Sequence, residues 1–353
     1  QETELKEVKT AIETLQRAWT YNPERVEIFE RLEILLSNEG EYDALENTYR
    51  ARLSHIKDND KDAVSIRLRL AKTLEENLDR VEESGAIYEQ VHQIEPGNEE
   101  VLTSLERIYT QSERWQPLVE IMRTRLDQKP DQDLAQNMHL ELGRVLWTHL
   151  SQVDAAVDHL QLVLKGDPTN ESAITLFEEI IEGGANVLEL APTLITSYQA
   201  LKRDEDLRKL IKLQIEATES PAARIEFRVR LIEELKSEDN STLEIMRQQL
   251  SCIADGADPE THLPEILDNA RKNDLLVEAT EALQEAADQS SETSLRIKLL
   301  AASAEIHEED LKSPEATIHV LEQMRMEDPS DLKTLKSLHR LHNDQGNVDA
   351  LLE

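Results

Sequence analysis

The residues best spaced for metal chemistry are three aspartates in the stretch DNDKD. Asp58, Asp60 and Asp62 occupy alternating positions, as the first ligands of a calcium loop do. Such a loop also needs a glycine at its sixth position and a bidentate glutamate at its twelfth, where this chain has Ala63 and Arg69. We therefore interpret the stretch as a solvated loop between helices.

Histidine and cysteine are the other candidate ligands. His339 and His342 are spaced i, i+3, but no HExxH motif and no cysteine pair accompanies them. The stretch RLRLAKTLEENL from 67 matches HLELGRVLWTHL from 139 with an offset of 72 residues, which pairs Leu74 with Leu146 and Glu75 with Trp147. His307 aligns with Leu74 and Leu146, which are core positions, and this indicates a packed histidine. Cys252 is the single cysteine and has no basic neighbour arranged to lower its pKa, so we expect a buried, unreactive thiol. The sequence predicts no metal site and no cofactor.

Motifs for nucleotide binding or nucleophilic catalysis are absent from the sequence. The stretch EGG at 182 lacks the lysine and the serine or threonine of a P-loop, and no GxSxG motif occurs. Carboxylates are common because 73 of 353 residues are acidic, so no single pair indicates a general acid and base. The sequence thus predicts a protein that is not an enzyme.

Composition restricts both the fold and the partners. With 9 glycines and 11 prolines, the chain has too few turn formers for an all-β protein, and we expect an all-α fold. The 73 acidic and 39 basic residues give a net charge of −34. This charge argues against nucleic acid and against an anionic membrane as partners. It is compatible with a basic protein partner, and also with a simple role in solubility.

The chain shows no targeting signal. No apolar run approaches membrane-spanning length, and neither a signal peptide nor a lipid-anchor motif is visible. A lone cysteine fits a reducing compartment, so a cytoplasmic location is expected. The chain begins at Gln1 without a methionine and ends in a helical pattern, and we expect a fragment of a longer array.

A pattern around four prolines recurs along the chain. Pro23, Pro96 and Pro168 are 73 and 72 residues apart, and Pro329 follows 161 residues later. Apolar residues stand six, nine and twelve positions after each proline, on one face of a helix: Phe29, Leu32, Leu35; Leu102, Leu105, Ile108; Ile174, Phe177, Ile180; Leu335, Leu338, Leu341. Small residues stand twelve positions before each: Ala11, Ser84, Ala156, Thr317.

This pattern resembles the tetratricopeptide repeat (TPR). From the small residue, a larger one follows after four positions, an apolar or small one after seven, and the proline after twelve. The TPR family pairs two antiparallel helices in each repeat of about 34 residues, so each 72-residue unit would hold two repeats. The resemblance implies an elongated, right-handed α-solenoid, a superhelix of antiparallel helix pairs.

The match divides the chain into three parts. Residues 1–183 are expected to hold TPR-like repeats in two-repeat units. Residues 184–275 keep helical periodicity but lose the motif, and the stretch ADGADPETH from 254 is expected to be an inserted loop. Residues 276–353 return to TPR-like repeats, truncated at the C-terminus.

The resemblance also implies a function. TPR proteins are scaffolds for protein–protein interaction, and the first helix of each repeat lines a concave groove that holds a peptide or a partner helix. Groove positions, four, seven and eleven after a proline, would be Glu27, Glu30, Ile34, Glu100, Thr103, Arg107, Ser172, Thr175 and Glu179. None is lysine or asparagine, the residues with which some TPR proteins clamp an acidic chaperone tail. A basic or mixed ligand is therefore expected.

Two alternatives stay open. Trp147 is a candidate binding residue because tryptophan is enriched among interaction hot spots, but a tryptophan that fills a gap between repeats is the competing interpretation. The acidic charge also allows a holdase or carrier for a basic protein. Binding to such a carrier should weaken steeply as salt rises, whereas a groove with apolar anchors should respond little.

Overall fold

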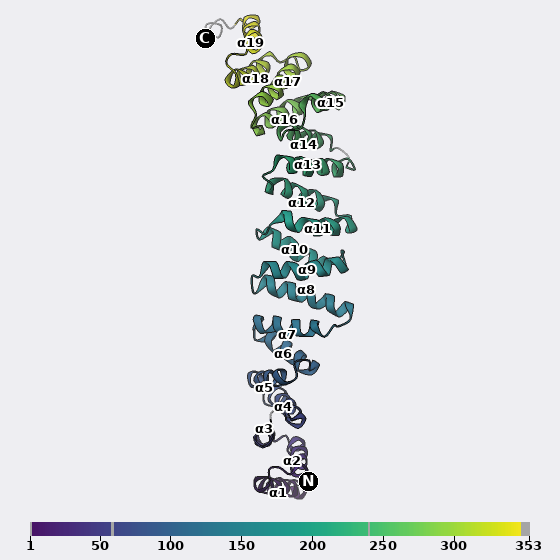
Figure 1. Cartoon of the computed structure of the whole chain (residues 1–353), viewed down its shortest axis with the longest axis vertical. Helices are drawn as coiled ribbons and strands as arrows, with labels where there is room; N and C mark the ends of the chain where they lie inside the picture. The colour runs from purple at the N-terminus through teal and green to yellow at the C-terminus, as the bar shows by residue number, and fades with distance from the viewer. Residues whose placement is uncertain (1, 58–59, 239–240, 347–353) are drawn as a thin grey trace. The chain divides into compact units, whose positions relative to one another are not determined.

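The computed structural model describes residues 2–57, 60–238 and 241–346. These residues form helices and connecting turns, and no β-strand occurs among them (Figure 1). The predicted all-α fold is confirmed. Asp58 of the DNDKD stretch lies outside the described residues. In the same three ranges, no helix combines the length and the apolar content that crossing a bilayer requires.

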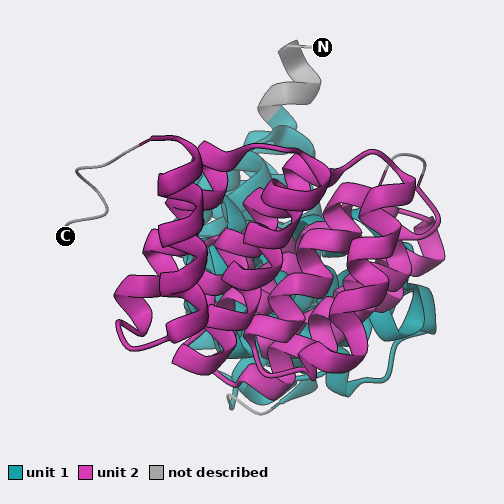
Figure 2. Cartoon of the chain, turned by 90° about the horizontal axis from the view of Figure 1, so that it is seen from above, with its two compact units in different colours: residues 1–176 teal, residues 177–353 magenta. Residues whose placement is uncertain are grey.

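The chain divides into two compact units, residues 1–176 and 177–353 (Figure 2). Helices of the first unit pack against one another in chain order. They are α1 (Glu2–Tyr21), α2 (Val26–Glu39), α3 (Tyr42–Leu53), α4 (Lys61–Lys72), α5 (Val81–Ile94), α6 (Glu99–Gln111), α7 (Trp115–Asp127), α8 (Gln132–Thr148) and α9 (Val153–Gly166). A π-helical turn, η1 (Thr73–Asn77), extends α4, and α10 (Glu171–Glu182) begins in this unit.

Helices of the second unit also follow one another in chain order, with one exception. They are α11 (Val187–Leu201), α12 (Asp204–Ala217), α13 (Pro221–Leu235), α14 (Thr242–Ala254), α15 (Pro259–Lys272), α16 (Leu276–Gln289), α17 (Thr293–Glu305), η2 (Ile306–Asp310), α18 (Pro314–Glu327) and α19 (Leu332–Asp344). The exception is that α14 packs more closely on α16 than on α15. In Figure 1, α15 lies to one side of α16. Within each unit, the predicted solenoid of helix pairs is confirmed.

The repeat pattern predicts the core well. Buried apolar side chains include Leu102, Leu105 and Ile108 after Pro96 and the upstream Tyr88, and the small Ser84 is buried as well. Because α1 packs mainly against α2, the first copy differs. Its buried residues are Ile12 and Trp19, while the predicted Ala11, Leu15 and Ala18 are only partly covered. The predicted register therefore holds except in α1, and at Leu35 and Leu335, which are also only partly buried.

Gly143 shows why the pattern needs a small residue on the first helix of a pair. A Cβ at this position would lie 2.7 Å from Leu160 Cδ2, closer than non-bonded carbons approach. Gly143 thus allows α8 and α9 to pack backbone against side chain, as the small position of the repeat implies.

Three helices that are the first of their repeats, α4 with η1, α8, and α17 with η2, end in the same wide turn. In each, a backbone N–H donates to the carbonyl six residues earlier: Arg80 to Leu74 (2.8 Å), Gln152 to Leu146 (2.9 Å) and Ser313 to His307 (2.8 Å). The residue before each donor is left-handed: Asp79, Ser151 and Lys312, with φ of 54°, 53° and 53°. These hydrogen bonds support the alignment of Leu74, Leu146 and His307 made from the sequence.

The loop predicted from residue 254 is shorter in the structure. The helix α14 ends at Ala254 and α15 already begins at Pro259. The Asp258 side chain caps α15 by accepting a 3.2 Å hydrogen bond from the Glu260 N–H, and Pro259 suits the first helical position because it needs no donor there. Only the first half of the predicted loop is therefore irregular.

Candidate protein-interaction surface

The ten predicted groove residues lie on four helices. Glu27, Glu30 and Ile34 are on α2, Glu100, Thr103 and Arg107 on α6, Trp147 on α8, and Ser172, Thr175 and Glu179 on α10. All are exposed except Trp147, which is half-buried. In the described part of the chain, no side-chain hydrogen bond or ion pair joins one of these ten residues to another. The structure places them on helix surfaces without assembling a single site.

Two of the ten take part in ion pairs between neighbouring first helices. Glu100 on α6 pairs with Lys72 on α4, and Arg107 on α6 pairs with Glu75 in η1. The hydrogen bond to Glu100 raises the pKa of Lys72. A ligand that used Glu100 or Arg107 would therefore have to displace Lys72 or Glu75.

The Glu75–Arg107 pair has a copy in the second unit. Glu308 in η2 pairs with Arg340 on α19, and the two pairs share a spacing of 32 residues. At the equivalent position of α8 the chain has Trp147, by the alignment that pairs it with Glu75. Trp147 therefore replaces a glutamate that elsewhere binds the next first helix, which keeps it a candidate for contact with a partner.

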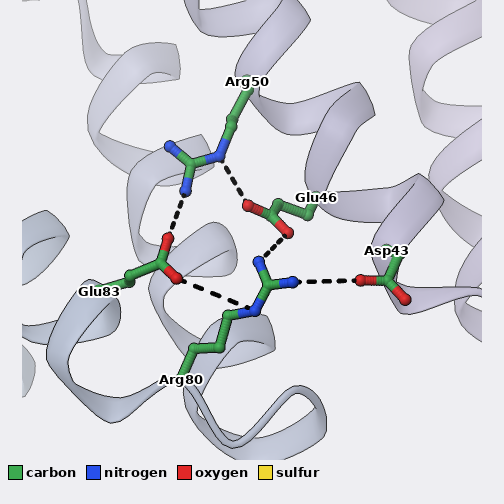
Figure 3. Close-up of polar contacts among 5 residues, drawn as sticks. All are labelled: Asp43, Glu46, Arg50, Arg80 and Glu83. Atoms are coloured by element: carbon green, nitrogen blue, oxygen red, sulfur yellow. Dashed lines mark hydrogen bonds and ion pairs between the residues drawn. The ribbon is translucent and has the colours of Figure 1, made fainter.

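The helices α3 and α5, each the second helix of a repeat, are joined by a cluster of ion pairs, shown in Figure 3. The buried Glu46 of α3 accepts hydrogen bonds from Arg50 Nε and from Arg80 Nη1, each 2.8 Å long. Arg50 Nη2 reaches Glu83 of α5 at 3.3 Å, and Arg80 Nη2 lies 3.5 Å from Asp43. These contacts link α3 to α5, so the cluster has a structural role.

The first unit has a cavity of about 580 Å³ between α1 and α2. Its apolar lining includes Ala11, Leu15 and Leu35, the positions left partly uncovered in α1 and α2, and the exposed Ile34. Ile34 thus joins a predicted groove position to this cavity.

The second unit has a groove between α15 and α17 with a volume of about 440 Å³. Leu263 and Leu267 of α15 and Ala301 and Ala302 of α17 form its apolar lining. Glu260 on α15 pairs with Lys298 on α17 at 2.8 Å, beside this lining. Towards the other end of both helices, Arg271 of α15 pairs with Asp310 of η2 at 2.9 Å. We call this the α15–α17 groove.

Sequence reasoning missed the α15–α17 groove, although a signal existed. Ala304 aligns with Ala71 and Gly143, and relative to this small residue the groove positions fall at Lys298, Ala301 and Glu305. All three line the groove. A register that starts from the repeat prolines does not reach these three positions, because no such proline precedes α17.

The thiol of Cys252 is buried, and burial raises its pKa to about 11. It is therefore protonated at neutral pH and a poor nucleophile, as the sequence predicts. His342 Nε2 lies 3.9 Å from Glu322, while His339 is exposed. Over the described ranges, no three or more His, Cys, Asp or Glu side chains are grouped so that they could hold a metal ion.

No protein-family model matches the chain, and no curated protein sequence matches it. Solved structures do. Two of the structural neighbours are described as tetratricopeptide repeat proteins.

One neighbour is a tetratricopeptide repeat protein from Parabacteroides merdae, 10% identical, with a TM-score of 0.31 over 89% of this chain and 97% of that one. A second is the C-terminal part of a TPR repeat-containing protein from Cytophaga hutchinsonii, 12% identical, with a TM-score of 0.28 over 77% and 99%. A third is MamA, 13% identical, with a TM-score of 0.31 over 48% and 95%.

Proposed function

We propose that this chain is a non-enzymatic scaffold that binds a peptide or a partner helix on the first-helix side of its repeats. The α15–α17 groove is the observation that carries the proposal. It lies at the register positions that line the groove in TPR-like repeats, and it is large enough for a few side chains. A cytoplasmic location is part of the same proposal.

The lining of the groove selects aliphatic side chains. Ala301 and Ala302 leave space on α17, and Leu263 and Leu267 form the opposite wall. Burying aliphatic side chains there gains about 25 cal/mol for each Å² of apolar surface removed from water. Polar ligands would lose hydrogen bonds to water without finding partners on these four residues.

The rim of the groove selects basic side chains. Glu260 and Glu305 both border it, and the Glu260 side chain is 77% exposed. The Glu260–Lys298 pair is exposed to water and contributes little to stability, so a ligand cation can replace Lys298 at little cost. The proposed ligand therefore carries aliphatic side chains next to lysine or arginine.

A random-peptide library displayed on phage tests this proposal on the full chain. We expect enriched peptides to combine leucine, isoleucine or valine with a neighbouring basic residue. Ala301→Phe fills the groove and should abolish their binding, whereas Ala222→Phe adds the same bulk at an exposed position of α13 and should not. Failure to enrich any peptide, or equal binding to both variants, would refute the proposal.

The acidic carrier is a second candidate because of α16. Its residues Glu278, Glu281, Glu285 and Asp288 fall along one helical stripe, and the sequence has no lysine or arginine from 273 to 295. A basic protein held by this stripe should dissociate as ionic strength rises, since exposed charges are screened within about 8 Å at physiological salt. Groove binding should survive the same salt increase and remain sensitive to Ala301→Phe.

A further inference from the structure

Two histidines of the first unit face each other across a helix pair. His139 on α8 and His159 on α9 place their Nδ1 atoms 2.9 Å apart, and their ring centroids are separated by 5.1 Å. Both side chains are partly buried. Two imidazole nitrogens approach this closely only with an electrophile between them, which is either a proton on one ring or a metal ion bound by both.

The geometry is close to that of two ligands of one metal ion. A tetrahedral ion with Zn–N bonds of 2.0–2.1 Å holds two nitrogens about 3.3 Å apart, so a small rotation of either ring admits the ion. Metal binding also requires unprotonated nitrogen. Burial lowers the pKa of both rings, and for His159 the effects of His139 and Arg123 add to it while Asp158 opposes them, so burial favours the neutral form of both rings.

We propose that His139 and His159 form an open two-histidine site for a first-row divalent metal ion such as Zn²⁺ or Cu²⁺. Water fills the other coordination positions, since no third ligand belongs to the site among the residues that the structure describes. Two nearby charges act on this site in opposite senses, because Arg123 repels a cation and Asp158 attracts it. An open site of this kind exchanges its metal readily.

The two ligands come from different helices, so the ion would clip α8 to α9. Unfolding separates the two rings, and the ion then stabilises only the folded state. This role is independent of the α15–α17 groove and adds to the proposed scaffold function.

Titration of the metal-free full chain with ZnCl₂ and CuCl₂ at pH 7.5 tests the site. Calorimetry should show one equivalent bound to the wild type, with an increase in Tm. His139→Gln and His159→Gln should each weaken this binding by more than about tenfold, because half of the protein ligands are lost. His319→Gln, which changes an exposed histidine of α18, is the matched control and should bind as the wild type does.

Copper EPR of the wild type gives a readout that does not depend on the variants folding. We expect nitrogen couplings from two imidazoles, reduced to one in each variant. Equal affinity and equal metal-induced Tm shift in the wild type and both variants would assign the ion to surface carboxylates and overturn the proposal. If no metal binds, or if EPR shows no coupling to two imidazoles, the short contact is explained by a proton shared between the rings. Either result would also overturn the proposal.

Discussion

The Tyr109 hydroxyl donates a 2.8 Å hydrogen bond to Glu89 Oε1, which joins α6 to α5. The Arg114 guanidinium donates to the same oxygen at 3.0 Å and lies 4.7 Å from the centre of the tyrosine ring. In the second unit, Tyr198 repeats the arrangement, with Glu178 at 2.7 Å and an arginine 4.8 Å from its ring. Burial, and then the bond to glutamate, raise the pKa of both phenols, so both stay protonated donors.

Removal of this hydroxyl should destabilise the first unit. Tyr109→Phe leaves Glu89 with a single partner, Arg114, and we expect a loss of about 1 kcal/mol in the free energy of unfolding. Urea denaturation followed by circular dichroism measures the loss. Tyr21→Phe is the control, since Tyr21 is 92% exposed, and it should change nothing. Equal stability of the two variants would mean that the hydrogen bond contributes nothing.

The cluster around Glu46 makes a second prediction. Glu46→Gln removes the charge that Arg50 and Arg80 share, and we expect a loss of about 1–3 kcal/mol because two guanidinium groups then lack their common partner. The nearby exposed Glu82→Gln should be close to neutral. In 1 M NaCl, the difference in the free energy of unfolding between Glu46→Gln and Glu82→Gln should become smaller, since salt screens part of the ionic interaction. Equal free energies of unfolding for Glu46→Gln and Glu82→Gln at low salt would contradict the structural role of the cluster.

The repeat register itself is tested on α6. Leu105 is fully buried and Thr103 is exposed two positions earlier on the same helix. Leu105→Asp should cost about 3 kcal/mol or more, because the carboxylate loses hydration and leaves a poorly filled site. Thr103→Asp should cost a few tenths of a kcal/mol at most. Similar melting of the two variants would show that the register is wrong.

His307 provides a prediction of pH dependence. Leu74 and Leu146 occupy its position in the two other wide turns, and its buried Nδ1 lacks a hydrogen-bond partner in the described part of the chain. His307→Leu should therefore stabilise the protein by about 1–2 kcal/mol at pH 8.

The stability gained by His307→Leu should grow on acidification. Burial lowers the pKa of His307 below its unfolded value of about 6.5, so the unfolded wild type binds more protons as the pH falls through this range. The wild type then loses stability progressively below pH 6.5, and the leucine variant lacks the part of this loss that comes from His307. Tm measured from pH 8 to pH 5 follows this divergence, and His319→Leu on the exposed face of α18 is the control. Parallel pH profiles would exclude burial of His307.

Much of the fold was predictable because the same spacing of core residues recurs in several copies of the repeat. Leu102, Leu105 and Ile108 were assigned correctly because a spacing of three residues closes one helical stripe. The stripe of α1 was predicted wrongly, since it depends on the helices that cover α1 rather than on its own periodicity. The domain boundaries at 183 and 275 remain predictions, as do the ten groove residues.

The candidate sites were harder to predict because they depend on pairs of helices. His139 and His159 are 20 residues apart and belong to no motif, and only the packing of α8 on α9 brings their rings together. The α15–α17 groove needs two small residues, Ala301 and Ala302, opposite two leucines of another helix. Sequence spacing within one helix contains neither relationship.

The constant spacing of Glu75–Arg107 and Glu308–Arg340 has an evolutionary consequence. Each pair joins the first helix of one repeat to the first helix of the next. Gain or loss of a whole repeat elsewhere in the gene therefore leaves the spacing between the two partners unchanged. Insertion of one codon inside the helix that carries either partner rotates the residues beyond it by about 100° and separates the charges. Natural variants of this chain should therefore differ by entire repeats more readily than by single residues within one.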